Sequence, residues 1–158
     1  MNRTEEERFR HSFWCWLLEH AAQKIDLHAD RTPGHHRQQS AALPVPGVGF
    51  DYVLRREDTA VELYLQREAR AENEAIFDRL RGHQQALEAQ IGHPLIWDRL
   101  PDRTGCRVRW RILEGGWQDP GTWPAAIPAT ADAMVIFSGA LTAPVLECAR
   151  AVLPLERA

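Results

Sequence analysis

The feature that most constrains the fold is a strict alternation in the last third of the chain. Between Cys106 and Leu113, the odd positions from 107 to 111 are arginines and the intervening residues are apolar or aromatic. Successive side chains of a β-strand point to opposite faces of a sheet. The segment therefore predicts a strand with one buried face and one face that carries Arg107, Arg109 and Arg111. The buried face requires a covering layer.

Two hairpins follow from the apolar spacing elsewhere. Residues 50–55 and 61–66 alternate between apolar and polar side chains, and the turn-forming residues 56–59 separate them. This pattern is typical of two antiparallel strands with a tight connection. Residues 95–100 form a short apolar run, which we expect to pair with the arginine-bearing strand as a second hairpin.

Three other segments place apolar residues at steps of three and four, the spacing of amphipathic helices. They cover residues 4–27, residues 72–90 and a region that begins near Thr122. The element order is then helix, hairpin, helix, hairpin, helix. It predicts an α+β fold with a mostly antiparallel, four-stranded sheet of two hairpins and helices on one face.

The size and charge of the chain narrow the function classes. A length of 158 residues fits one domain, so we expect residues 1–158 to form a single domain with a long loop at residues 28–47. The net charge of -3 gives no global attraction to nucleic acid or to acidic membranes. No apolar run in the sequence predicts a membrane span. Three widely spaced cysteines, Cys15, Cys106 and Cys148, favour reduced thiols in the cytoplasm.

One enzyme class has partial support. A restriction-like, metal-dependent nuclease places an acidic residue on one strand and an Asp/Glu-x-Lys motif on the next. Asp51 and Glu62 lie on neighbouring predicted strands, but Tyr64 stands where the motif needs lysine. This nuclease is the alternative catalytic hypothesis, with Asp51 and Glu62 as its residues. The sequence favours no catalytic residue.

Residues 28–36 contain a group of potential metal ligands. These are His28, Asp30, His35 and His36. Their spacing matches no zinc motif, and no cysteine joins them. We therefore predict a solvated loop without a metal, and we expect no cofactor, because glycine-rich phosphate-binding motifs are absent from the sequence.

A family resemblance adds context. The residues that carry it, in chain order, are Val61–Leu65, Asn73, Ile76–Leu80, Gln90–Gly92, Pro94–Trp97, Leu100 and Arg107–Val108. This order resembles the bacterial and archaeal family of domain of unknown function 4268, from Phe13-Trp14 to Trp123-Pro124. The family supplies no established activity for named residues. The resemblance implies that relatives often follow a restriction-like nuclease module, and hence a defence or DNA-processing role.

The arginine face supports a binding hypothesis. Guanidinium groups along a strand suit carboxylates or phosphates, and Arg55 and Tyr64 would join the three arginines on that face. We expect a non-catalytic, cytoplasmic recognition domain whose partner is a protein. Nucleic-acid binding through the arginines and a homodimer through the first helix are alternatives. A solvated face, balanced by acids such as Glu62 and Asp98, remains the plainest alternative. Trp14 and Trp16 cannot share a helix face, so we expect one of them nearer the surface.

Overall fold

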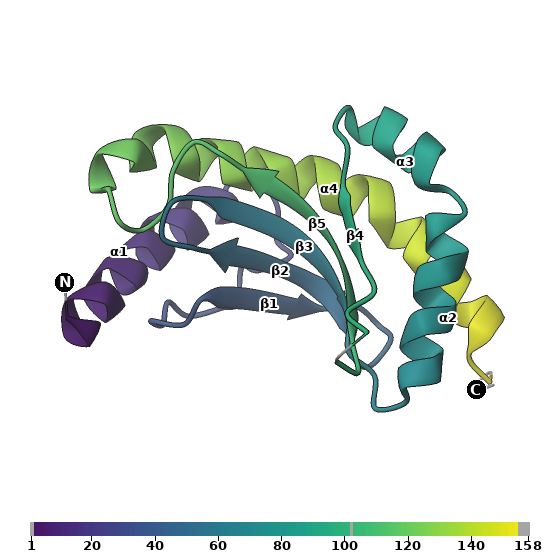
Figure 1. The fold of residues 1–158 in the computed structure, drawn as a ribbon. Helices are drawn as coiled ribbons and strands as arrows, with labels where there is room; N and C mark the ends of the chain where they lie inside the picture. The colour runs from purple at the N-terminus through teal and green to yellow at the C-terminus, as the bar shows by residue number, and fades with distance from the viewer. Residues whose placement is uncertain (1, 102, 155–158) are drawn as a thin grey trace. The chain divides into compact units, whose positions relative to one another are not determined.

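The computed structural model describes residues 2–101 and 103–154 and has an α+β fold (Figure 1). Five strands form one antiparallel sheet in the order β1-β2-β3-β5-β4. The strands are β1 (Gln38–Ala42), β2 (Val48–Leu54), β3 (Thr59–Leu65), β4 (Ile96–Asp98) and β5 (Cys106–Ile112). The helices are α1 (Arg3–Ala22), α2 (Arg70–Arg81), α3 (Gln84–Ile91) and α4 (Trp123–Val152), with a 3-10 turn η1 (Pro120–Thr122) before α4.

The α+β class and the antiparallel sheet are confirmed, whereas the strand count and order are wrong in detail. The fifth strand is β1, which lies inside the segment expected to be the loop 28–47. The second predicted helix is two helices, because the chain breaks at Gly82 and His83 between α2 and α3. The sheet is also not two adjacent hairpins. After α2, α3 and β4, the chain returns so that β5 lies between β3 and β4.

The chain divides into two compact units, and α4 and four of the strands, β1, β2, β3 and β5, contribute to both. The first unit comprises Met1–Ala41, Asp51–Val61 and Arg111–Val135. The second unit comprises Ala42–Phe50, Glu62–Trp110 and Ile136–Ala158.

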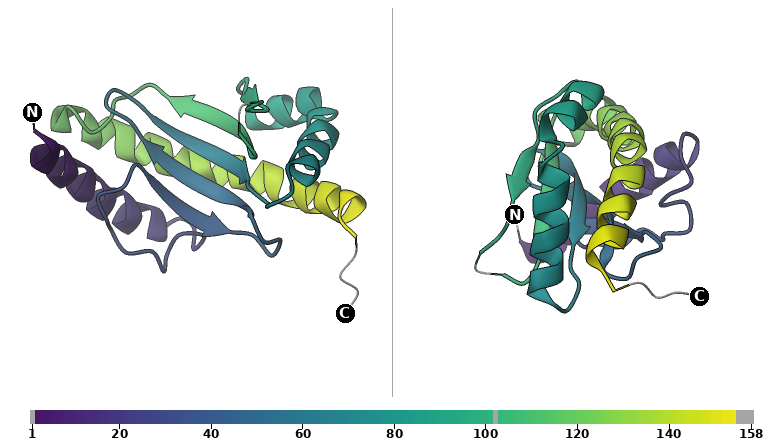
Figure 2. Two further views of the ribbon diagram at one scale, coloured as in Figure 1. Left: turned by 60° about the horizontal axis from the view of Figure 1, so that its bottom comes forward. Right: turned by 90° about the vertical axis from the view of Figure 1, so that its right-hand side faces the viewer.

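In the first unit, helices cover one side of the strands. Figure 2 shows α1 and the first half of α4 on the same side. The rings of Phe13 and Trp123 meet edge to face with centroids 5.5 Å apart, which joins the two helices. The hydroxyls of Thr59 on β3 and Thr130 on α4 form a buried hydrogen bond of 2.6 Å. The helical face of this unit is therefore closed by packing and by one polar contact.

Part of the segment expected to be a loop is fixed against α1. Arg10 Nε donates to the carbonyl of His35 at 2.7 Å, and Trp14 Nε1 donates to the carbonyl of His36 at 2.7 Å. Buried side-chain donors of one helix thus bind the backbone that precedes β1. Trp14 is fully buried and Trp16 is 54% exposed, which confirms that one of these two tryptophans lies near the surface.

In the second unit, aromatic contacts and one carboxylate hold the helices to the strands. Phe50 on β2 meets Phe137 on α4 at 5.9 Å between ring centroids. The Glu88 carboxylate on α3 accepts from the Leu95 backbone N–H at 2.7 Å and from Trp97 Nε1 at 3.2 Å. These bonds hold the start of β4 against α3.

Helix α4 is unusually apolar. By length and composition alone, Pro120–Val152 would suffice to cross a membrane, although the sequence predicted no such segment. Half of its most apolar window is buried within the protein, and core helices of soluble proteins pass the same test.

Candidate functional site

Each of the three alternating arginines of β5 is ion-paired with a carboxylate. Arg107 Nη2 lies 3.2 Å from Asp98 Oδ2, and these two residues face each other in the register of β4 and β5. Arg109 pairs with Glu62 on β3, and Arg111 pairs with Asp58 just before β3. The predicted arginine strand is present, and the strands beside it supply a matching row of acids.

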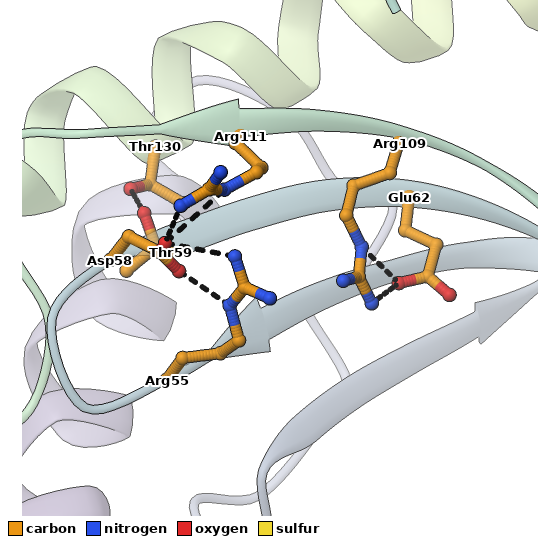
Figure 3. A network of polar contacts seen from close by, with 7 residues as sticks. All are labelled: Arg55, Asp58, Thr59, Glu62, Arg109, Arg111 and Thr130. Carbon is orange, nitrogen blue, oxygen red and sulfur yellow. Dashed lines mark hydrogen bonds and ion pairs between the residues drawn. The ribbon is translucent and has the colours of Figure 1, made fainter. Parts of the chain in front are cut away.

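The Arg109–Glu62 pair is buried. Arg109 donates from Nη2 at 2.8 Å and from Nε at 3.2 Å to the same oxygen, Glu62 Oε2 (Figure 3). Only 9% of Arg109 and 6% of Glu62 is exposed. Arg109, expected on an exposed face of the sheet, is instead buried and paired. The reason is that Glu62, expected among exposed residues, lies within hydrogen-bonding distance across the strand pair.

The pairing at Asp58 differs because one carboxylate serves two arginines. Arg55 donates from Nε to Asp58 Oδ1 at 2.5 Å and from Nη2 to Oδ2 at 2.8 Å. Arg111 donates from Nη2 to Asp58 Oδ2 at 2.6 Å and from Nε at 3.3 Å (Figure 3). We call Arg55, Asp58 and Arg111 the Asp58 cluster. It contains two positive charges and one negative charge.

The hairpin between β2 and β3 positions this cluster. Arg55 follows the last residue of β2, and its backbone N–H donates to the Asp58 carbonyl at 2.9 Å to close the turn. Arg111 comes from β5, the neighbour of β3 in the sheet. A tight turn and a cross-strand neighbour therefore bring both guanidinium groups to the same carboxylate.

The two arginines of the cluster are partly exposed, whereas its aspartate is buried and ionised. The side chains of Arg55 and Arg111 are 39% and 46% exposed, whereas that of Asp58 is 10% exposed. Burial raises the pKa of Asp58, but hydrogen bonds and charges from the two arginines outweigh burial and hold this pKa below its usual value. The cluster is therefore a fixed carboxylate with two partly solvated guanidinium groups.

The remaining predicted site residues are dispersed. Tyr64 is half-buried on β3. Asp51 is 2% exposed and accepts a hydrogen bond from the Ser40 hydroxyl. The two carboxylates of the nuclease hypothesis, Asp51 and Glu62, are thus each engaged by a partner of their own.

The histidines of the 28–36 segment do not assemble as ligands. His28 is 3% exposed and contacts Tyr52 in a tilted arrangement with ring centroids 4.6 Å apart, so the loop is not wholly solvated as expected. His35 and His36 are exposed and stack on each other at 4.9 Å. Within residues 2–101 and 103–154, no group of three or more His, Cys, Asp or Glu residues is arranged to hold a metal ion.

Sequence reasoning missed the central residue of the cluster, Asp58. Asp58 was assigned only to a turn, although an aspartate three residues after an arginine across a hairpin is a simple signal for an ion pair. Trp117 accepts cation–π contacts from Arg10 at 5.8 Å and from Arg56 at 5.7 Å. The backbone N–H of Trp117 also donates to the Arg55 carbonyl at 3.0 Å, which places this ring beside the β2–β3 turn.

Comparison with known families settles the relationship of the chain. A family model described as domain of unknown function (DUF4268) matches residues 9–144. The chain belongs to this family. A comparison with curated proteins and a comparison with solved structures each gave no significant match. Membership of the DUF4268 family assigns no activity to a residue.

Proposed function

We propose that this DUF4268 protein is a non-catalytic recognition domain that binds a protein partner through the Asp58 cluster. The partner presents acidic side chains or a terminal carboxylate to Arg55 and Arg111. We further propose a cytoplasmic role in a bacterial defence or DNA-processing system. That context rests on the family resemblance, and the three free cysteines agree with a reducing compartment.

The observation that carries the proposal is the charge imbalance at Asp58. One buried carboxylate holds two guanidinium groups, and each guanidinium uses only its Nε and Nη2 groups for Asp58. A guanidinium has five N–H donors, so N–H groups on both arginines remain for a partner. Asp58 fixes the orientation of both arginines before binding, which reduces the entropy lost when a partner carboxylate docks.

Two features near the cluster resemble protein interfaces more than nucleic-acid sites. Leu113 follows Arg111 by two residues and is 72% exposed. Arg56 is exposed and lies over the Trp117 ring. Arginine and aromatic residues are enriched in protein–protein interfaces, where they provide much of the binding energy. A nucleic-acid site would favour arginines without carboxylate partners, whereas Arg107 and Arg109 are each paired one to one.

The nuclease hypothesis has weaker support. Glu62 is neutralised by Arg109, and Asp51 is bound by Ser40. A metal would have to displace both partners, and a buried arginine beside a cation site would repel that cation. Incubation of the purified protein with DNA or RNA and magnesium or manganese tests this alternative, because cleavage that is lost in Glu62→Gln would favour it over the binding domain.

Recovery of the native complex tests the proposal. The tagged chain is purified from cells of its native host, and the co-purifying proteins are identified and quantified. Arg55→Gln and Arg111→Gln are compared as single variants, because each leaves Asp58 with one guanidinium and preserves the fold. We expect each variant to retain roughly one-tenth or less of the partner.

Arg79→Gln is the matched control, since Arg79 is an exposed arginine on α2, outside the cluster. It should retain the partner at the wild-type level. Recovery of a bare monomer, or equal recovery with all variants, would contradict the proposal. Recovery of nucleic acid alone would favour the second binding hypothesis.

A further inference from the structure

A second basic site lies in the first unit, in the segment that precedes and begins β1. A cavity of about 730 Å³ is bounded by Arg10 and by residues 31–40. Its volume lies within the range of about 300–1,000 Å³ that is common for small-molecule sites. Its wall includes Arg31, Arg37 and His36. Nothing in the proposed function uses this cavity.

The cavity wall is cationic. Its lining residues, all of which the structure describes, include three arginines and two histidines and no aspartate or glutamate. Arg31 and Arg37 are exposed. Across residues 2–101 and 103–154, neither guanidinium has a hydrogen-bond or ion-pair partner. Two free guanidinium groups beside a cavity favour a ligand with several negative oxygens, because such groups bind phosphate in a forked geometry.

Two carboxylates near this wall, those of Glu6 and Asp51, are already engaged. Glu6 Oε2 lies 3.8 Å from Arg10 Nη1, and Asp51 accepts the Ser40 hydroxyl. Arg10 is itself buried and donates to the carbonyl of His35, so its guanidinium is held in the cavity wall. The positive charge of the free arginines is therefore not cancelled within the wall.

The backbone of the cavity is held in place before any ligand arrives. Arg10 and Trp14 bind the carbonyls of His35 and His36, and the ring of His11 lies 3.2 Å from the Gly34 carbonyl through Nδ1. Three side chains of α1 thus fix three consecutive peptide carbonyls. A wall fixed in this way lowers the ordering cost of binding.

The same wall offers a surface for a planar ring. His35 and His36 stack with centroids 4.9 Å apart and an interplanar angle of 30°, and both are exposed. Nucleobases stack on aromatic side chains, and this contact tolerates any base. We propose that the cavity binds a nucleotide, with its phosphates on Arg31 and Arg37 and its base against the histidine pair. The nucleotide is either free or part of a single strand.

Titration of the whole protein with defined probes tests the proposal. The probes are a nucleoside triphosphate, a fluorescently labelled ten-nucleotide single strand and inorganic phosphate, each followed by calorimetry or anisotropy. We expect saturable binding of the triphosphate or of the single strand. Binding should weaken at least roughly tenfold in the double variant Arg31→Gln/Arg37→Gln. Both residues are exposed, so the variant should fold, and circular dichroism verifies this.

Arg79→Gln serves as the control and should bind like the wild type. Tight binding of the triphosphate identifies a free nucleotide as the ligand, whereas binding of the single strand alone identifies nucleic acid. Failure of both nucleotide probes to bind at millimolar concentration would overturn the proposal. Equal binding by the double variant, or equal affinity for inorganic phosphate and the nucleotides, would also overturn it. These outcomes are independent of partner capture by the Asp58 cluster.

Discussion

The buried ion pair between Glu62 and Arg109 makes the sharpest prediction about stability. Glu62→Gln keeps the volume of the side chain but leaves the Arg109 charge without a counter-charge. Removal of one partner of a buried pair costs about 3–5 kcal/mol. The two side chains are 8% and 11% exposed, so residual water lowers the expected cost to about 3 kcal/mol. For a chain of this length, that loss corresponds to a fall in Tm of roughly 6–12 °C.

A double-mutant cycle isolates the interaction free energy between Glu62 and Arg109 from the contacts that each makes with other residues. Urea unfolding, followed by circular dichroism, gives the free energy of unfolding for the wild type, Glu62→Gln, Arg109→Met and the double variant. Each single variant loses stability because the remaining partner, Arg109 or Glu62, is left buried without a counter-charge. The double variant removes both charges, so its loss should be smaller than the sum of the single losses by at least about 1.5 kcal/mol.

The neighbouring pair of Asp98 and Arg107 provides the matched control. Its side chains are 36% and 28% exposed, and pairs of this kind contribute about 0–1 kcal/mol. Asp98→Asn should therefore lower the free energy of unfolding by less than about 1 kcal/mol. Equal losses for Glu62→Gln and Asp98→Asn, or additive losses in the Glu62 and Arg109 cycle, would refute the argument from burial.

Three other predictions concern ionisation, thiol reactivity and the α3–β4 contact. The pKa of Asp58 is depressed in the folded state, so its contribution to stability exists above its unfolded pKa and is lost as the pH falls through the folded value. Asp58→Asn should therefore show a shallower loss of stability below about pH 4 than the wild type, and an unchanged acid limb would contradict this. Burial raises the pKa of the Cys106 thiol to about 11. A maleimide at pH 8 should therefore label the half-buried Cys15 first. Rapid labelling of Cys106 in the native protein would contradict this prediction. Glu88→Ala should cost about 1–2 kcal/mol in urea unfolding because two donors lose their acceptor, and a loss near zero would show that water replaces the carboxylate.

Local patterns predicted those elements whose apolar residues follow a clear period. The alternation at 106–112 identified β5, because a period of two is a property of the strand itself. The same reasoning failed for β1, whose sequence Gln-Gln-Ser-Ala-Ala lacks the β-branched and aromatic residues that mark strands. This segment is a strand because β2 pairs with it, which is a tertiary effect.

The candidate site was predictable only in part. Alternation placed the arginines on one face of a strand, but it could not assign their partners, because pairing depends on the order of strands in the sheet. Since β5 lies beside β3 rather than only beside β4, Arg109 and Arg111 meet Glu62 and Asp58. Because β3 lies beside β5, the arginines that were expected to be unpaired are ion-paired. An excess positive charge remains only at Asp58 within this group, because Arg55 adds a second guanidinium to that carboxylate.

Hydrogen exchange of the chain in its native complex tests recognition through the Asp58 cluster most directly. The proposal predicts that peptides covering residues 55–58 and 111–113 become protected when the partner binds, while peptides of α2 stay unchanged. Protection confined to α2 and α3, with unchanged exchange at residues 55–58 and 111–113, would contradict it.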